Sequence, residues 1–255
     1  MPDVTHYPLL VFLLSVLVLW LAACLGAYIR TRRAGPDELA RDDHGIILAA
    51  TLTLLGLIIG FSFSMATNRY DQRKNFEEEE ANAIGTEFVR ADLLADAEAV
   101  KLRGLLKAYL EQRILFYTTS DEASLRQIND RTSRLQTELW DVVKAPARTQ
   151  PTPIVALVVA GMNDVLNSQG YSQAALWNRI PTAAWGLMVA IAICCNLLIG
   201  FGARSPKVGS KLFLVLPLVV SVAFLLIADI DSPRHGVIRV APQNLHSLAG
   251  ALRGQ

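Results

Sequence analysis

The chain has 255 residues, of which 52% are hydrophobic and 18% charged, and its formal net charge is +1. The mean hydropathy of +0.34 shows that the chain carries more apolar side chains than an ordinary soluble domain contains. A net charge this close to zero offers no electrostatic footprint for nucleic acid, so we expect no partner of that class.

Four segments contain no Asp, Glu, Lys or Arg, and their lengths run from 17 to 23 residues, the fourth being the shortest. They are residues 8–29, 45–67, 182–203 and 212–228. A helix rises about 1.5 Å per residue, so about 20 residues cross a hydrocarbon core of about 30 Å. These lengths predict an all-α integral membrane protein with four transmembrane helices. The predicted divisions are 1–67 with spans one and two, 68–181 as a helical extramembrane domain, 182–231 with spans three and four, and 232–255 as a C-terminal tail.

The first span has one competing interpretation, which is a cleaved lipoprotein signal ending at residues 21–24. Against it, residues 1–7 hold no Lys or Arg, as a signal n-region should, and the apolar stretch continues to Ile29. Cys24, Cys194 and Cys195 all lie inside predicted spans, where a thiol packs as a small residue. We therefore predict no disulfide framework, no metal site and no cofactor.

The second span carries a small-residue pair and a polar end. Gly56 and Gly60 lie one turn apart, a spacing that permits close packing between helices. Ser62 and Ser64 follow near the end of the span, where their hydroxyls either bond back to the preceding turn or line a pore.

No Pro interrupts residues 45–82, so we predict that the second span continues as one helix beyond the membrane. On this extension Arg69 and Arg73 share a face, and Glu77 follows one turn later, within pairing distance of Arg73. One interpretation is a solvated helix exit with interfacial anchors. The other is a vestibule in which each arginine becomes a ring of cations in a symmetric oligomer and attracts anions.

Apolar residues in the middle segment recur with helical spacing. One stripe runs over residues 84–116 and a second over 125–142, which predicts an antiparallel pair of amphipathic helices. Residues 118–121 form the turn, with Ser120 or Asp121 as the cap of the second helix. Prolines at 146, 151 and 153 are expected to break the chain, and the apolar run 154–166, too short to span, begins a third helix.

Two carboxylates close the fourth span. Asp229 and Asp231 lie at a helix C-terminus, where negative charge opposes the helix dipole and requires a partner. The candidate partners are Arg234 and Arg239, or basic residues on the extension of span two. A divalent ion is a weaker alternative, because two carboxylates fall short of a calcium shell.

Orientation follows from the basic residues of the short connections, which tend to stay in the cytoplasm. One set of basic residues favours a cytoplasmic position of both short loops, which would place the helical domain and both termini outside the cytoplasm. This set is Arg30, Arg32, Arg33, Arg41, Arg204, Lys207 and Lys211. The residues that favour the reverse are Arg69, Arg73, Lys74, Arg179, Arg234 and Arg239. The count favours the first topology by a small margin, and a C-terminal reporter active on only one side of the membrane would decide.

Enzyme signatures are missing from the sequence, so we predict that the protein is not an enzyme. Residues 200–202 begin a dinucleotide fingerprint, but Ser205 stands where the third Gly belongs, and the four histidines form no zinc motif. Embedded acids or bases that would mark a proton path are absent from all four segments.

Several strings resemble the bacterial bestrophin-like membrane proteins, a family defined by a domain of unknown function. They are residues 61–73, 80–86, 90–94, 178–181 and 229–240. The positions that carry this family pattern are Arg69, Tyr70, Arg73, Glu80, Asn82, Gly85, Arg90, Asp229, Asp231, Pro233, Arg234 and Gly236. Ser232 departs from the pattern, since a basic residue is expected there, which puts any role of that position in doubt.

The resemblance implies a bacterial inner-membrane protein distantly similar to bestrophins, which are pentameric chloride channels with the intermembrane domain in the cytoplasm. That topology conflicts with the charge count. Our leading hypothesis is a homo-oligomer in the lipid bilayer that passes small anions along span two, with Ser62, Ser64, Arg69 and Arg73 at the pathway. The alternative is a membrane-anchored interaction module whose helical domain, expressed alone, still captures a partner protein.

Overall fold

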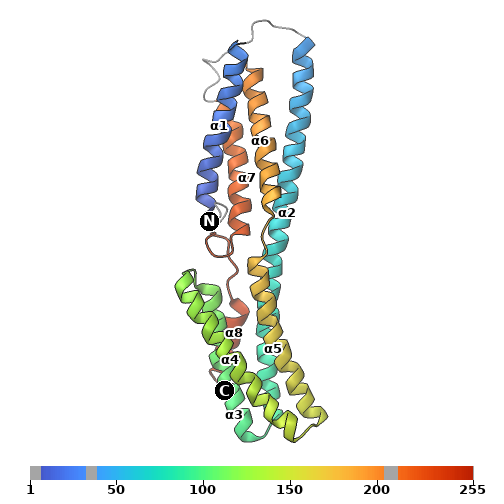
Figure 1. Cartoon of the computed structure of the whole chain (residues 1–255), viewed down its shortest axis with the longest axis vertical. Coiled ribbons are helices and arrows are strands. Elements are labelled where there is room, and N and C mark those ends of the chain that lie inside the picture. Colours follow the sequence, from blue (N-terminus) through green and yellow to red (C-terminus); the bar gives the residue numbers. More distant parts are fainter. Residues whose placement is uncertain (1–6, 33–38, 204–211, 255) are drawn as a thin grey trace. The chain divides into compact units, whose positions relative to one another are not determined.

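The computed structural model describes residues 7–32, 39–203 and 212–254, and every regular element in those ranges is a helix (Figure 1). The chain divides into two compact units. We call Met1–Arg69 with Arg179–Arg239 the membrane unit, and Tyr70–Asn178 with Val240–Gln255 the helical unit. The expected tail 232–255 is thus divided between the two units. Of the basic residues used for orientation, Arg33, Arg204, Lys207, Lys211 and the side chain of Arg41 lie outside the described residues.

Among the described residues, three segments hold helices long and apolar enough to cross a membrane, namely Pro8–Arg32, Asp43–Leu93 and Pro153–Gly202. In the third segment the uncharged stretch is α6 (Thr182–Gly202). A further apolar helix, α7 (Val215–Asp231), has 17 residues. That is fewer than the roughly 20 that a perpendicular span needs, so a fourth span stays a prediction.

The core of the membrane unit is the packing of α1 (Pro8–Arg32) against α6 and α7. Gly26 of α1 and Gly200 of α6 lie where the two backbones approach closely, because a Cβ on either would meet the backbone of the other helix. Tyr7 and Tyr28, both about half exposed, stand at the two ends of α1. Their separation of about 32 Å along the helix matches the thickness of a hydrocarbon core, as expected for interfacial anchors.

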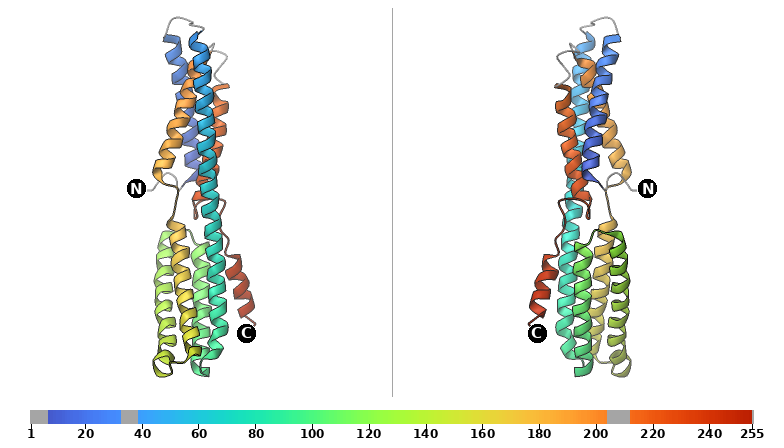
Figure 2. Two further views of the ribbon diagram at one scale, coloured as in Figure 1. Left: turned by 90° about the vertical axis from the view of Figure 1, so that its right-hand side faces the viewer. Right: turned by 90° about the vertical axis from the view of Figure 1, so that its left-hand side faces the viewer.

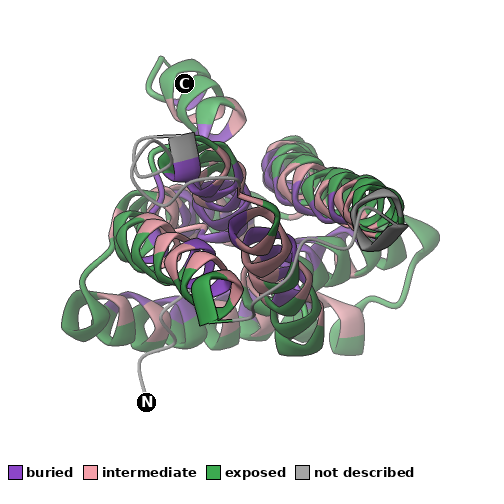
Figure 3. Cartoon of the chain, turned by 90° about the horizontal axis from the view of Figure 1, so that it is seen from above, coloured by how far each residue is buried: buried purple, intermediate pink, exposed green. Residues whose placement is uncertain are grey.

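A single helix of 52 residues, α2 (Leu39–Arg90), begins in the membrane unit and ends in the helical unit. This is the unbroken extension that the lack of Pro predicts. In its apolar part few residues are buried, among them Leu55, Ser62 and Ala66. In the described part of the chain, a Cβ on Gly56 or Gly60 would meet nothing within 4 Å, so the predicted small-residue pair packs against no other helix there. Figure 3 shows how buried and exposed residues alternate around the helices.

The helical unit contains the end of α2, α3 (Asp96–Thr118), α4 (Glu122–Thr149), α5 (Pro153–Trp177) and α8 (Gln243–Leu252). In Figure 2 the long helices α3, α4 and α5 run side by side, and α3 contacts α4 as α4 contacts α5. Asp121 caps α4 by accepting the Ser124 N–H at 2.8 Å, which confirms one of the two expected caps. Thr152 caps α5 in the same way. The unit has a hydrophobic core, with Ile84, Leu102, Leu106, Leu139 and Val158 among its buried members.

Two sequence-based expectations are wrong. The stripe over 84–116 is not one helix, because the chain turns at residues 91–95, where Ala91–Leu93 is a 3₁₀ turn and Leu94 is extended. The turn folds the apolar faces of α2 and α3 onto one core, and that burial outweighs the local tendency to continue the helix. Pro146 does not break α4, which ends only at Thr149. Since a Pro near a helix end removes only one hydrogen bond, the last turn absorbs it.

Candidate functional site

The polar end of the apolar part of α2 has two different sides. Ser64 and Asn68 are exposed, one turn apart, and continue the exposed side of Phe61. Ser62 is only 4% exposed and lies on the opposite, buried side with Ala66. Of the two serines predicted at the pathway, the structure therefore leaves Ser64 accessible and places Ser62 inside the chain.

The two predicted vestibule arginines also differ in their surroundings. Arg73 is 3% exposed, and its Nε donates to the Ala175 carbonyl oxygen at 3.2 Å while its Nη2 donates to that of Asn178 at 3.4 Å. It thereby satisfies carbonyls at the end of α5 that lack partners within the helix. Arg69 is half-buried and contacts the Met65 sulfur at 3.8 Å. Arg73 thus has a structural contact inside the helical unit, whereas Arg69 keeps an accessible part.

The closing motif of the membrane unit is built by its two carboxylates. Asp229 accepts the backbone N–H groups of Val237 and Ile238 at 2.7 and 2.8 Å. Asp231 accepts the N–H of Ile180 through both oxygens, at 3.1 and 3.2 Å. Both are nearly buried, at 8% and 3% exposed. Backbone amides are thus among the partners that offset the unfavourable position of these carboxylates at a helix C-terminus. The bond between Asp231 and Ile180 also holds the segment before α6 against the end of α7.

Gly236 is required where this motif turns back on α7. A Cβ there would meet the carbonyl oxygens of Asp229 and Ser232, so a larger residue would displace the backbone. Ser232, the departure from the family pattern, is fully buried, and its carbonyl oxygen accepts the Gly236 N–H at 3.2 Å. Pro233 and Arg234 lie half-buried in the turn between them. Among the described residues no group of three or more His, Cys, Asp or Glu is placed to hold a metal ion.

A second cluster of polar groups lies in the interior of the helical unit. Glu80 of α2 and Arg113 of α3 form an ion pair, and both side chains are fully buried. The Glu80 carboxylate accepts the Tyr117 hydroxyl at 3.2 Å and the Ser172 hydroxyl at 2.9 Å. Both α3 and α5 therefore bind this carboxylate. Burial is the main cause that raises the pKa of the Tyr117 hydroxyl above its ordinary value, and the negative charge of Glu80 raises it further. The hydroxyl therefore keeps its proton and acts as a donor.

The remaining family positions on α2 have simpler surroundings. Gly85 faces α8, where a Cβ would lie 3.1 Å from the Leu248 side chain. Arg90 donates to the carbonyl oxygen of Leu157 at 3.5 Å. Tyr70 is half-buried and Asn82 is exposed. Residues of the family pattern therefore lie in both units of the chain.

A family model for the bestrophin-like domain matches residues 10–245 of this chain. The chain belongs to the bestrophin-like family. A mutant of a bacterial bestrophin homologue from Klebsiella pneumoniae has a similar fold, with a TM-score of 0.65 and 13% identity over 97% of this chain and 99% of that one. Another crystal structure of a homologue from the same organism gives 0.62 and 14%, over 95% and 98%. No curated protein matches. At such identities, the similarity shows the bestrophin fold alone.

Sequence reasoning did not predict that Arg113, Glu77 and Glu87 of this bestrophin-like chain are buried. Arg113 had a signal, because it lies four residues after Tyr109 and three before Phe116, on the apolar stripe of α3. Glu77 accepts the Leu245 N–H at 2.9 Å, a contact across 168 positions that no local pattern contains.

Glu87 is the unusual group of the helical unit. It is fully buried, and neither carboxylate oxygen has a hydrogen-bond partner among the described residues. Its carboxylate lies against Gly161 of α5, beside Arg90. Burial raises the pKa of the Glu87 carboxyl to about 8, with Arg90 opposing the shift and Asp164 adding to it. The carboxyl is therefore mainly protonated at neutral pH.

The raised pKa of Glu87 makes the stability of the helical unit depend on pH. Between the ordinary carboxyl pKa of 4.5 and about 8, the folded state keeps a proton that the unfolded state releases. Unfolding is thus favoured by rising pH, and roughly 2 to 4 kcal/mol of stability should be lost between pH 5 and 8. Replacing Glu87 with Gln should flatten the dependence of melting temperature on pH, measured by circular dichroism of the full chain.

The control for this comparison is Glu79→Gln, on the exposed side of the same helix. It should keep the wild-type slope of melting temperature against pH. Equal slopes for the wild type and the Glu87 variant would show that this carboxyl is ionised in the folded state.

Proposed function

We propose that this bestrophin-like protein is an oligomeric membrane channel for small anions and that the exposed side of α2 lines its pathway. Membership of the family supports a membrane-embedded role. The observation that carries the proposal is the exposed side of α2, on which Gly60, Phe61, Ser64 and Asn68 follow one another. A helix facing only lipid would be apolar there, so these polar groups favour contact with water or another copy of the chain.

Symmetric assembly would give these side chains a defined role. Copies of α2 arranged about an axis would turn each exposed position into a ring, with Phe61 as an apolar constriction and Ser64 and Asn68 as hydrogen-bond donors. Arg69 would add a ring of positive charge at the mouth, which raises the local concentration of anions. Ser62 and Arg73 would support this pathway from behind.

We also propose that α7 is a fourth membrane span. Together with the 3₁₀ turn Leu212–Leu214 it covers 20 residues that end at Asp231. The helical rise gives about 32 Å, enough to cross a hydrocarbon core. The carboxylates of Asp229 and Asp231 would then lie at the membrane surface, where their amide partners reduce the cost of burying them.

A charge substitution on the exposed side of α2 tests the channel. In liposomes that contain the purified full chain, Asn68→Asp should lower chloride flux about tenfold, because a ring of carboxylates repels anions at the pathway. The same variant should raise the permeability to potassium relative to chloride. Flux is measured by the quenching of a chloride-sensitive dye and selectivity by the reversal potential.

The matched control is Asn167→Asp, the same change at an exposed position of α5. It should leave the flux within twofold of the wild type. Absence of chloride flux in the wild type, or equal flux in both variants, would contradict the proposal. Arg73 is unsuitable for this test, because its loss would also release the end of α5.

A further inference from the structure

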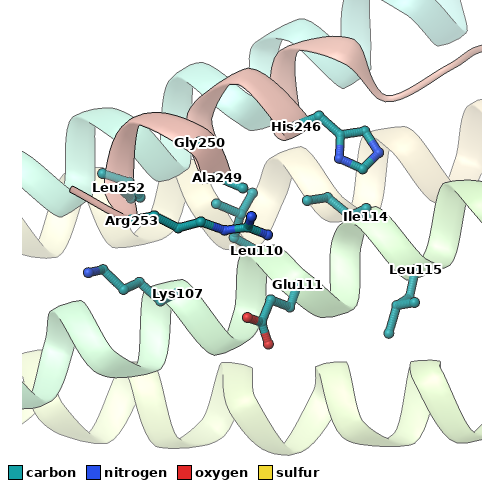
Figure 4. Close-up of a pocket in the computed structure, with 10 residues that line it drawn as sticks. All are labelled: Lys107, Leu110, Glu111, Ile114, Leu115, His246, Ala249, Gly250, Leu252 and Arg253. Atoms are coloured by element: carbon teal, nitrogen blue, oxygen red, sulfur yellow. The ribbon is translucent and has the colours of Figure 1, made fainter. Parts of the chain in front are cut away.

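A groove of about 540 Å³ runs between α3 and α8 of the helical unit (Figure 4). Its apolar side chains come from both helices and include Leu110, Ile114, Leu115 and Leu252. Its charged side chains are Lys107 and Glu111 of α3 and Arg253, which follows the last residue of α8. The volume lies in the range of small-molecule sites, roughly 300 to 1,000 Å³, and the combination of an apolar floor with a few charges is typical of them.

The groove is formed before any ligand arrives, because α8 is held in place from its other side. The buried carboxylate of Glu77 accepts the N–H of Leu245 at 2.9 Å and the side-chain amide of Asn244 at 2.7 Å. Leu245 is itself fully buried in the core. At the other end of α8, a Cβ on Gly250 would meet nothing within 4 Å. The wall that α8 contributes is thus fixed, with free space in front of Gly250.

The two cations at the groove are available to a ligand. Within the part of the chain that the structure describes, neither Lys107 nor Arg253 forms an ion pair. Lys107 contacts the face of the Phe88 ring at 5.6 Å, and Figure 4 shows the Arg253 guanidinium extending over the floor near Leu110. Lys107, Glu111 and Arg253 together give the rim a formal net positive charge. Charge complementarity therefore favours an anionic head.

We propose that this groove binds a single-chain amphiphile with a carboxylate head, of the fatty-acid class. The head would lie between Lys107 and Arg253, and the alkyl chain would run along Leu110 and Ile114 to Leu115. From Lys107 to Leu115 the helix rises about 12 Å, which suits a chain of medium length. Burial of the methylenes on this floor stabilises the bound chain, while the two cations fix the orientation of the head. The site is independent of the proposed pathway along α2.

Photochemical labelling of the full chain in lipid nanodiscs tests the site. The probe is dodecanoate with a diazirine near its terminal methyl group, and the labelled peptides are mapped by mass spectrometry. We expect labels on α3 between residues 110 and 118 and on α8, with competition by unmodified dodecanoate. Labelling confined to the membrane unit would overturn the proposal. So would equally strong competition by dodecanol and dodecanoate, because it would show an apolar surface without an anion site.

A variant that fills the groove provides the structural control. Gly250→Trp should reduce labelling at least tenfold, since the indole would occupy the free space in front of α8. Gly104→Trp is the matched variant, because Gly104 of α3 also has open space but does not line the groove. It should be labelled like the wild type. Equal labelling of both Trp variants would overturn the proposal.

A second variant keeps the test independent of the fold of α8. Lys107→Gln combined with Arg253→Gln removes both cations from exposed or half-buried positions and should weaken competition by dodecanoate about tenfold. Arg131→Gln, at an exposed position of α4, should leave it unchanged. If the double variant competes like the wild type, or if an acidic peptide displaces the probe while dodecanoate does not, the groove is not a fatty-acid site.

Discussion

Replacing Arg113 with Met should unfold the helical unit at a temperature at which the wild type is still folded. The substitution leaves Glu80 fully buried without its ion-pair partner, although the hydroxyls of Tyr117 and Ser172 still donate to it. The guanidinium also lies 4.2 Å from the centre of the Phe116 ring, a contact that Met replaces only in part. Breaking a buried pair from one side costs about 3 to 5 kcal/mol, a large share of typical domain stability.

The ion pair itself need not stabilise the unit, and a second variant separates the two effects. Exchanging both partners, Glu80→Leu together with Arg113→Met, removes the uncompensated charge and should restore most of the lost stability. Arg126→Met, at an exposed position of α4, is the control and should change stability by less than about 0.5 kcal/mol. The readout is thermal unfolding followed by circular dichroism. A double variant no more stable than the Arg113 single variant would show that packing, and not charge, is lost.

The helices of this protein are largely predictable because their signals are local. Uncharged length indicates the membrane-capable helices, and Asp121 caps α4 through a hydrogen bond only three residues long. The turn at residues 91–95 has no comparable signal, since it contains neither Gly nor Pro and the apolar spacing continues through it. It forms because α2 and α3 bury their stripes against each other, a gain that exists only in the folded chain.

The candidate site shows the same division between local and distant causes. Asp229 and Asp231 attract attention because carboxylates at a helix C-terminus are unfavourable without partners. One of these partners, the N–H of Ile180, is 51 residues from Asp231 in the chain, so its identity could not be derived from spacing. On α2 the sequence indicates which residues are polar, but not that Ser62 faces inward while Ser64 is exposed.

The second large effect is expected at the contact between α1 and α6. A Cβ on Gly200 would lie 2.8 Å from the carbonyl carbon of Ala23 and 2.9 Å from the nitrogen of Ala27, and it would be closer still to the Ala23 oxygen. These are backbone atoms, so no rotamer change can relieve the clash and the helices must separate. Gly200→Ala should therefore destabilise the membrane unit by about 3 kcal/mol or more, at the upper end of overpacking effects.

Two other glycines isolate the cause of that loss. Gly186→Ala adds the same methyl group to α6, where nothing lies within 4 Å, and should melt like the wild type in detergent. Gly170→Ala does the same on α5. If all three variants melt together, α1 and α6 do not approach as closely as described. If only Gly200→Ala unfolds, the loss comes from the close approach of α1 and α6 at Gly26 and Gly200, because the other two variants add the same methyl group where there is room for it.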